Sequence, residues 1–183
     1  DQARNRQRAL ALCGTASVLA FAALAWQSHR TPAIWMLLVT LGIGWVALFG
    51  AWRATVSLTG AKLLPHIWIF ALRCTGFFAE PVFEDDHFRF LWDGRQLALT
   101  GNPYDRAPRE HFTDATLPDR FQSILGNINH PDVPTIYGPV CQFVFALSYW
   151  IAPGELWPLK ALLIGADLLV LGLLLRLVAA RHA

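Results

Sequence analysis

The chain has 183 residues, of which 55% are hydrophobic and 15% are charged, and its formal net charge is +2. A soluble domain usually carries nearer a quarter charged residues. The small net charge, without a stripe of Lys and Arg between aromatic residues, argues against a nucleic-acid partner. Because several apolar blocks approach the roughly 20 residues that a helix needs to cross a bilayer, the sequence predicts an all-α membrane protein rather than a soluble enzyme.

Five apolar blocks follow one another along the chain. We interpret them as about five transmembrane helices within a single membrane domain covering residues 1–183. Trp35, Trp45 and Trp52 lie in the second block, partly near its ends, as aromatic residues at membrane interfaces often do. The predicted spans are residues 9–27, 33–52, 63–83, 138–152 and 159–179.

A long polar stretch, residues 84–137, separates the third block from the fourth. It contains many aromatic residues, which disordered segments lack. Its beginning has helical spacing, which predicts a helix from about Asp85 to Thr100, ended by Gly101 and Pro103. A second, weaker helix is predicted over about residues 114–125.

The distribution of Lys and Arg predicts the orientation of the chain, because these residues are enriched in short cytoplasmic loops. With a cytoplasmic N-terminus, only Arg30 and Arg181 among the short flanks lie outside. The polar stretch 84–137 then forms a long, partly helical extracytoplasmic loop. The basic residues that this orientation places inside are Arg4, Arg6, Arg8, Arg53, Lys62 and Lys160.

Three adjacent carboxylates, Glu84, Asp85 and Asp86, stand where the third block leaves the membrane. A helix N-terminus relieves part of their mutual repulsion. The crowding can raise one carboxyl pKa or recruit a cation, and a carboxylate here can act as general base for an acceptor hydroxyl. The structural alternative is a helix cap with a solvated acidic patch.

Other polar residues of the loop can bind a substrate or support the fold. Asp86, Arg89 and Asp93 share one helical side, so Arg89 can pair with a carboxylate or hold a phosphate. Arg95 and Tyr104 follow in the motifs Trp-Asp-Gly-Arg and Asn-Pro-Tyr. Further along the loop and at the start of the fourth block, the candidates for hydrogen bonds to sugar hydroxyls or a phosphate are His130, Asp132, Tyr137 and Gln142.

Asp167 lies near the middle of the fifth apolar block. An ionisable residue there is costly and usually faces a partner or a wet cavity. Arg73, in the third block, is a plausible partner. Asp167 can serve as a polar clasp between helices, or with Arg73 as an intramembrane relay in a transporter.

Three stretches of the loop, taken in order, resemble a known family. They are FEDDHFRFLWDGR (83–95), GNPY (101–104) and NHPDVPTIYGPVCQ (129–142). Their order and spacing resemble bacterial polytopic glycosyltransferases of the GT-C class, closest to the mannosyltransferase-like branch that depends on polyprenyl-phosphate sugars. The resemblance covers roughly residues 65–175.

The resemblance implies a function and a location. Such enzymes move a sugar, with mannose the candidate here, from a polyprenyl-phosphate donor to a lipid, glycan or protein acceptor at the outer face of the membrane. The implied location is the bacterial inner (cytoplasmic) membrane, with several passes. A divalent cation, Mg²⁺ or Mn²⁺, is used by some members and not by others.

Carried to this chain, the resemblance makes Asp86 the expected catalytic base and Asp85 the alternative or helper. Arg89 and Arg95 become candidates for the donor phosphate. The remaining expected substrate-binding residues are Glu84, Asp93, Tyr104, His130, Tyr137 and Gln142.

The chain also departs from the family pattern, because members are usually longer and have more spans. We therefore expect an N-terminal portion of such an enzyme, or one part of an assembly in which a partner chain completes the fold. The alternative function is a non-catalytic membrane scaffold or lipid-handling subunit of a cell-envelope assembly.

Overall fold

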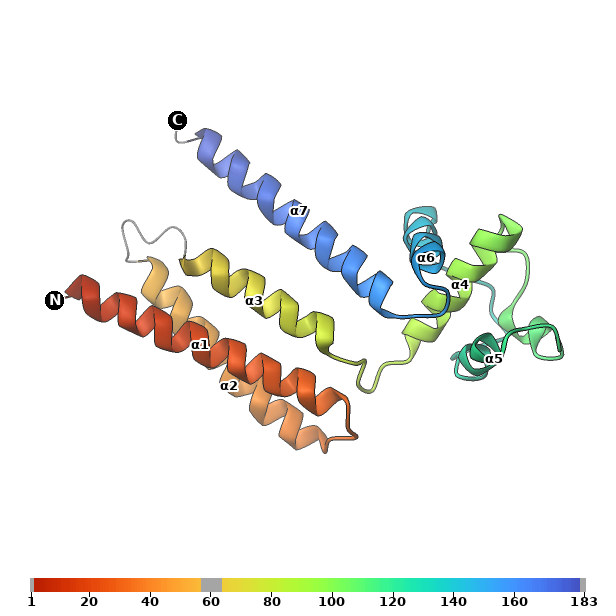
Figure 1. The fold of residues 1–183 in the computed structure, drawn as a ribbon, viewed down its shortest axis with the longest axis horizontal. Helices are drawn as coiled ribbons and strands as arrows, with labels where there is room; N and C mark the ends of the chain where they lie inside the picture. Colours follow the sequence, from red (N-terminus) through yellow and green to blue (C-terminus); the bar gives the residue numbers. More distant parts are fainter. Residues whose placement is uncertain (1, 57–63, 182–183) are drawn as a thin grey trace. The chain divides into compact units, whose positions relative to one another are not determined.

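The computed structural model describes residues 2–56 and 64–181, and the regular elements of these ranges are all helical. The chain divides into two compact units, residues 1–82 and 83–183, which are described separately. Figure 1 shows the helices of each unit. The first unit holds α1 (Gln2–Ser28), α2 (Ile34–Val56) and α3 (Leu64–Phe78), and the second holds α4 (Asp86–Thr100), η1 (Pro108–His111), α5 (Asp119–Gly126), α6 (Pro139–Ile151) and α7 (Trp157–Arg181).

The first unit is a bundle in which α1 packs against α2 and α3. Leu10 of α1 is buried with Ala51 and Ala54 of α2, and Trp68 of α3 packs on the same cluster. Small alanine side chains at such contacts let helix backbones approach closely, as in membrane helix packing. The rest of the surface of these helices is largely exposed apolar side chains.

Three helices are long and apolar enough to cross a membrane, namely Arg4–Ser28, Ile34–Thr55 and Trp157–Leu177. They support a helical membrane protein, but the predicted count of five spans is not confirmed. α3 has 15 residues and α6 has 13. At about 1.5 Å per residue these helices reach roughly 20–23 Å, short of the roughly 30 Å hydrocarbon core.

The third predicted span differs most from the structure. Its last residues, 79–83, lie beyond the end of α3. Residue 63, the predicted start of this span, lies outside the described residues. Lys62, one of the basic residues that predict the orientation, also lies outside them.

In the second unit, the predicted loop helix is confirmed as α4. It ends as predicted at Gly101, which adopts a left-handed conformation (φ 75°) and donates its N–H to the carbonyl of Leu97 at 3.0 Å. The second predicted helix is confirmed only in part. α5 begins at Asp119, directly after Pro118, and residues 112–118 form turns and irregular backbone instead.

α4 is the central helix of the second unit and packs on both α5 and α6. On one side, Leu91 and Trp92 are buried against Phe121, Ile124 and Leu125 of α5. Each such buried side chain stabilises the unit by roughly 1.5–3 kcal/mol. The long predicted loop is therefore a folded subdomain with its own apolar core.

On its other side α4 meets α6 at very short range. A Cβ atom placed on Gly94 would lie 2.3 Å from the carbonyl oxygen of Phe145. Only glycine therefore permits this backbone approach.

We expect Gly94→Ala to separate α4 from α6 and to lower the free energy of unfolding by about 1–3 kcal/mol, the usual cost of overpacking. The matched control is Gly126→Ala, because nothing lies within 4 Å of a Cβ at that helical position. Thermal unfolding midpoints of the purified variants in detergent measure the difference. Equal midpoints for the two variants would contradict the assigned contact.

Candidate functional site

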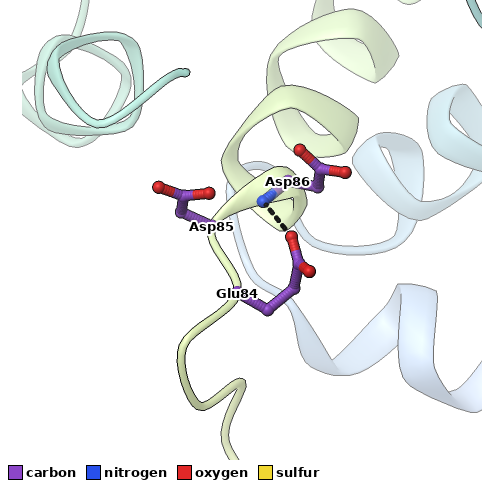
Figure 2. Close-up of side chains that lie close together, drawn as sticks. All are labelled: Glu84, Asp85 and Asp86. Carbon is purple, nitrogen blue, oxygen red and sulfur yellow. Dashed lines mark hydrogen bonds between the residues drawn. The ribbon is translucent and has the colours of Figure 1, made fainter.

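The acidic triplet lies at the start of α4. The Glu84 carboxylate accepts the backbone N–H of Asp86 at 3.1 Å, and Asp85 accepts a hydrogen bond from the Asn129 amide. Figure 2 shows Glu84 and Asp86 on one side of the helix start and Asp85 on the other. One carboxylate oxygen from each residue lies within 4.8 Å of the others, and such oxygens are ligands that Mg²⁺ and Mn²⁺ prefer.

A cavity of about 230 Å³ opens beside this triplet. It lies between the first turn of α4 and the segment 129–137. Asp86 is exposed there, whereas Arg89 is only 9% exposed. The lining residues are Asp86, Arg89, Asn129, His130, Val133, Pro134, Ile136 and Tyr137.

A buried carboxylate, Asp93, joins the elements that surround this cavity. The Arg89 Nε–H donates to Asp93 Oδ1 at 2.9 Å. The amide of Gln142, in α6, donates to Asp93 Oδ2 at 3.2 Å and to the Thr135 hydroxyl oxygen at 2.8 Å. Asp93 and Gln142 are each 1% exposed. These bonds join α4, the segment 129–137 and α6 at one point.

Burial raises the pKa of the Asp93 carboxyl, while a hydrogen bond from Thr135 and the positive charge of Arg89 oppose that rise. A buried charge of this kind is tolerated only when it is paired and hydrogen-bonded. Asp93 therefore stabilises the site through its partners.

Arg89 both bonds to Asp93 and lines the cavity. Its Nη2 also donates to the carbonyl oxygen of Val133 at 2.8 Å. Among the described residues, these bonds account for two of the five N–H groups that a guanidinium carries. A nearly buried cation with further N–H donors thus lines the cavity.

Tyr137 also lines the cavity. Its hydroxyl donates to Asp86 Oδ2 over a long 3.4 Å. Its ring packs edge-on against Phe90 and Phe145. Burial and the adjacent Asp86 carboxylate raise the pKa of the Tyr137 phenol, so it stays protonated and remains a donor. Tyr104 supports the segment by donating to the Tyr137 carbonyl at 2.8 Å.

His130 lies in the cavity wall with a positive φ of 50°. This left-handed region is uncommon for residues other than glycine, although histidine enters it more often than most. The conformation is followed by a turn in which the Val133 N–H donates to the His130 carbonyl at 3.1 Å. Strained backbone of this kind is often found at functional sites.

The structure brings most of the predicted site residues together, with two exceptions. Asp132 is exposed, accepts a hydrogen bond from Arg109 at 2.9 Å and does not line the cavity. Arg95 lies on the α5 side of α4, with its guanidinium over the rings of Trp92 and Phe121. It does not line the cavity beside Asp86. Its predicted contact with a donor phosphate stays a prediction.

Sequence reasoning missed two residues of this arrangement. Asn129 lines the cavity and binds Asp85, and Thr135 bonds both Asp93 and Gln142. Both stood within the motif stretch 129–142, but short polar residues in a proline-rich segment give no separate signal of their own.

Larger hollows lie elsewhere in the second unit. One of about 480 Å³ is lined by His111, Asp114 and Gln122 among others, and one of about 330 Å³ by Gln96, Asp105 and Arg106 among others. Neither contains the acidic triplet or Arg89. The 230 Å³ cavity beside Asp86 is the better candidate site because it combines an exposed carboxylate, a buried cation and a phenol.

Comparisons with known proteins identify no relative of this chain. No protein-family model, no curated protein and no solved structure matches it.

Removing the Asp93 carboxylate should destabilise the second unit. We expect Asp93→Ala to leave Arg89 buried without its counter-charge and to cost about 3–5 kcal/mol of unfolding free energy. Asp105→Ala is the matched control, because Asp105 and Arg106 form an exposed pair at 3.9 Å. Thermal unfolding in detergent compares them, and an Asp93→Ala midpoint equal to the control would refute the structural role of this carboxylate.

Proposed function

We propose that this protein is a membrane glycosyltransferase that moves a sugar, with mannose as the first candidate, from a polyprenyl-phosphate donor to a lipid, glycan or protein acceptor. The observation that carries the proposal is the cavity that places Asp86, Arg89, His130 and Tyr137 around one space. These residues come from segments about 40–50 positions apart, and the motif resemblance predicts each of them at the site. The proposal also rests on the motif resemblance to GT-C enzymes.

Asp86 has the position that a general base needs. Its Oδ2 accepts the Tyr137 hydroxyl, and among the described residues no hydrogen bond is found to Oδ1. Oδ1 can therefore accept the proton of an acceptor hydroxyl as that oxygen attacks the anomeric carbon. The bond from the anomeric carbon to the phosphate oxygen breaks in the same step, and the electron pair leaves with the phosphate.

Arg89 is the group that would stabilise the negative charge of the leaving phosphate. A guanidinium in a partly dry site stabilises a phosphate more strongly than it would in water. Because its Nε and Nη2 are held by Asp93 and Val133, its position is set before the donor binds. The leaving phosphate already carries charge, so this cation can replace a general acid.

A divalent cation fits the acidic triplet Glu84, Asp85 and Asp86 by the type of its ligands, and Glu84 and Asp85 would hold it so that Asp86 Oδ1 stays available as the base. Bound there, Mg²⁺ or Mn²⁺ would neutralise charge on the donor phosphate. The site would face the extracytoplasmic side of a bacterial inner membrane, with the N-terminus in the cytoplasm.

We expect Asp86→Asn to lower sugar transfer by roughly 10²–10⁴-fold, the contribution typical of a general base. The assay uses membrane vesicles that contain the full chain, polyprenyl-phosphate mannose as the first donor and endogenous lipid as acceptor. Expression and membrane insertion should be unchanged, because Asp86 is exposed.

Asp105→Asn is the control for this experiment, since Asp105 is an exposed carboxylate of the same loop and lies outside the cavity. Transfer by Asp86→Asn at the level of this control would remove Asp86 from the catalytic role.

Arg89→Lys should retain a positive charge but lose the paired geometry, because an ammonium group cannot hold Asp93 and Val133 while also facing the cavity. We expect KM for the donor to rise and kcat to fall, each by about tenfold, equivalent to roughly 1.4 kcal/mol. Steady-state kinetics over a range of donor concentration measure both. A wild-type KM in Arg89→Lys would contradict contact between this guanidinium and the donor.

A further inference from the structure

We infer that α6 does not cross the membrane but lies along its surface with one apolar face in the lipid, and that α7 alone crosses after the loop. The inference concerns the lipid-contacting surface and the topology of the chain. It stands independently of the proposed catalytic function.

The two ends of α6 contact the same folded loop. Near its beginning, Gln142 bonds to Asp93 of α4. Near its end, Tyr149 packs on Phe121 of α5 with ring centroids 5.9 Å apart.

The turn that follows α6 is also held by the loop. The Arg120 Nε–H of α5 donates to the carbonyl of Gly154 at 2.9 Å, and its guanidinium pairs with Glu155. If α6 crossed a hydrocarbon core of roughly 30 Å, this turn would lie on the far side from α5. Both contacts place residues 154 and 155 on the side of the membrane that holds the loop.

The direction of α6 agrees with this placement. Figure 1 shows α7 lengthwise and α6 nearly end-on, so the two helices do not run antiparallel. Two consecutive spanning helices joined by a short turn would run nearly antiparallel. With only 13 residues, α6 is also too short to span the bilayer upright.

α6 has two different faces. Gln142, Ala146 and Ser148 are buried, and Gln142 bonds to Asp93 of α4. The other face carries large apolar side chains at helical spacing and no charge. Its residues are Val140, Phe143, Leu147, Trp150 and Ile151, exposed by 78%, 65%, 42%, 63% and 48%.

Lipid is the occupant that the surroundings of this face favour. α7, a candidate membrane span, begins at Trp157 only six residues after Ile151, so the face adjoins the bilayer directly. Trp150 and Trp157 flank the turn, and tryptophan is enriched at the level of lipid headgroups. An apolar helix face in that position is typical of interfacial helices.

The basic residues fit this topology better than five crossings. Counted with α1, α2 and α3 crossing, as in the five-span prediction, a surface α6 returns α7 to the side of the N-terminus, with Arg176 and Arg181 there and Lys160 outside. Five crossings would leave both arginines outside. The change therefore increases the excess of positive charge on the cytoplasmic side.

Single cysteines test the topology. In a background with Cys13, Cys74 and Cys141 changed to alanine, the variants Asp105→Cys, Glu155→Cys and Arg181→Cys are treated with a membrane-impermeant maleimide. Labelling is compared in right-side-out and inverted vesicles, and labelling in detergent gives the total. We expect positions 105 and 155 to react from one side and position 181 from the other.

Labelling of position 155 from the side opposite to 105 would overturn the surface placement of α6. Labelling of position 181 from the same side as 105 would overturn the crossing by α7. Each result is independent of enzymatic activity and of the absolute orientation of the chain.

Spin labels test the occupant of the apolar face. Labels at Phe143→Cys, Leu147→Cys and Trp150→Cys in phosphatidylcholine–phosphatidylglycerol vesicles report depth from the ratio of oxygen to nickel-chelate collisions. We expect a uniformly shallow position for all three, with Leu169→Cys in α7 as the deep reference. A depth maximum at 147 would overturn the surface placement, and protection from both reagents, as in an interface with a second copy, would overturn the lipid contact.

Discussion

The second unit depends on one interaction, the paired and buried carboxylate of Asp93. A charge removed from water must be compensated within the protein, and here Arg89, Thr135 and Gln142 supply that compensation. Because these partners come from α4, the segment 129–137 and α6, their bonds fix the register of all three. Gly94, the next residue, allows the backbone of α6 to approach closely enough for the bonds to form.

This arrangement separates the charged residues of the site into two groups. Asp93 and Gln142 are buried and hold the shape of the site, whereas Asp86 is exposed and free to meet another molecule. Arg89 belongs to both groups, since its Nε side pairs with Asp93 while its remaining donors line the cavity. Geometry alone therefore distinguishes supporting residues from those that can contact a ligand.

The same contacts also bind α6 to the loop. Gln142 attaches its first turns to α4, and Arg120 attaches the turn that follows it to α5. The apolar face that remains is uncharged and adjoins α7. A site built on such a subdomain would lie at the lipid–water boundary, where a lipid-anchored substrate carries its polar group.

The sequence by itself determined features that depend on near neighbours. The apolar blocks, the loop helix from Asp86 to Thr100 and its stop at Gly101 follow from composition, periodicity and capping, which act within a few residues. It also indicated Asp86, Arg89, His130 and Tyr137 as site residues. Their roles in catalysis and binding stay predictions.

The tertiary structure alone decided which of these residues meet. The bond between Asp93 and Gln142 joins positions 49 apart, and the placement of Arg95 away from the cavity depends on how α5 packs. The tertiary structure also shows that α6 packs on the loop, whereas hydropathy predicts that α6 is a membrane span. Hydropathy measures how apolar a helix is, but only packing shows whether that surface meets protein or lipid.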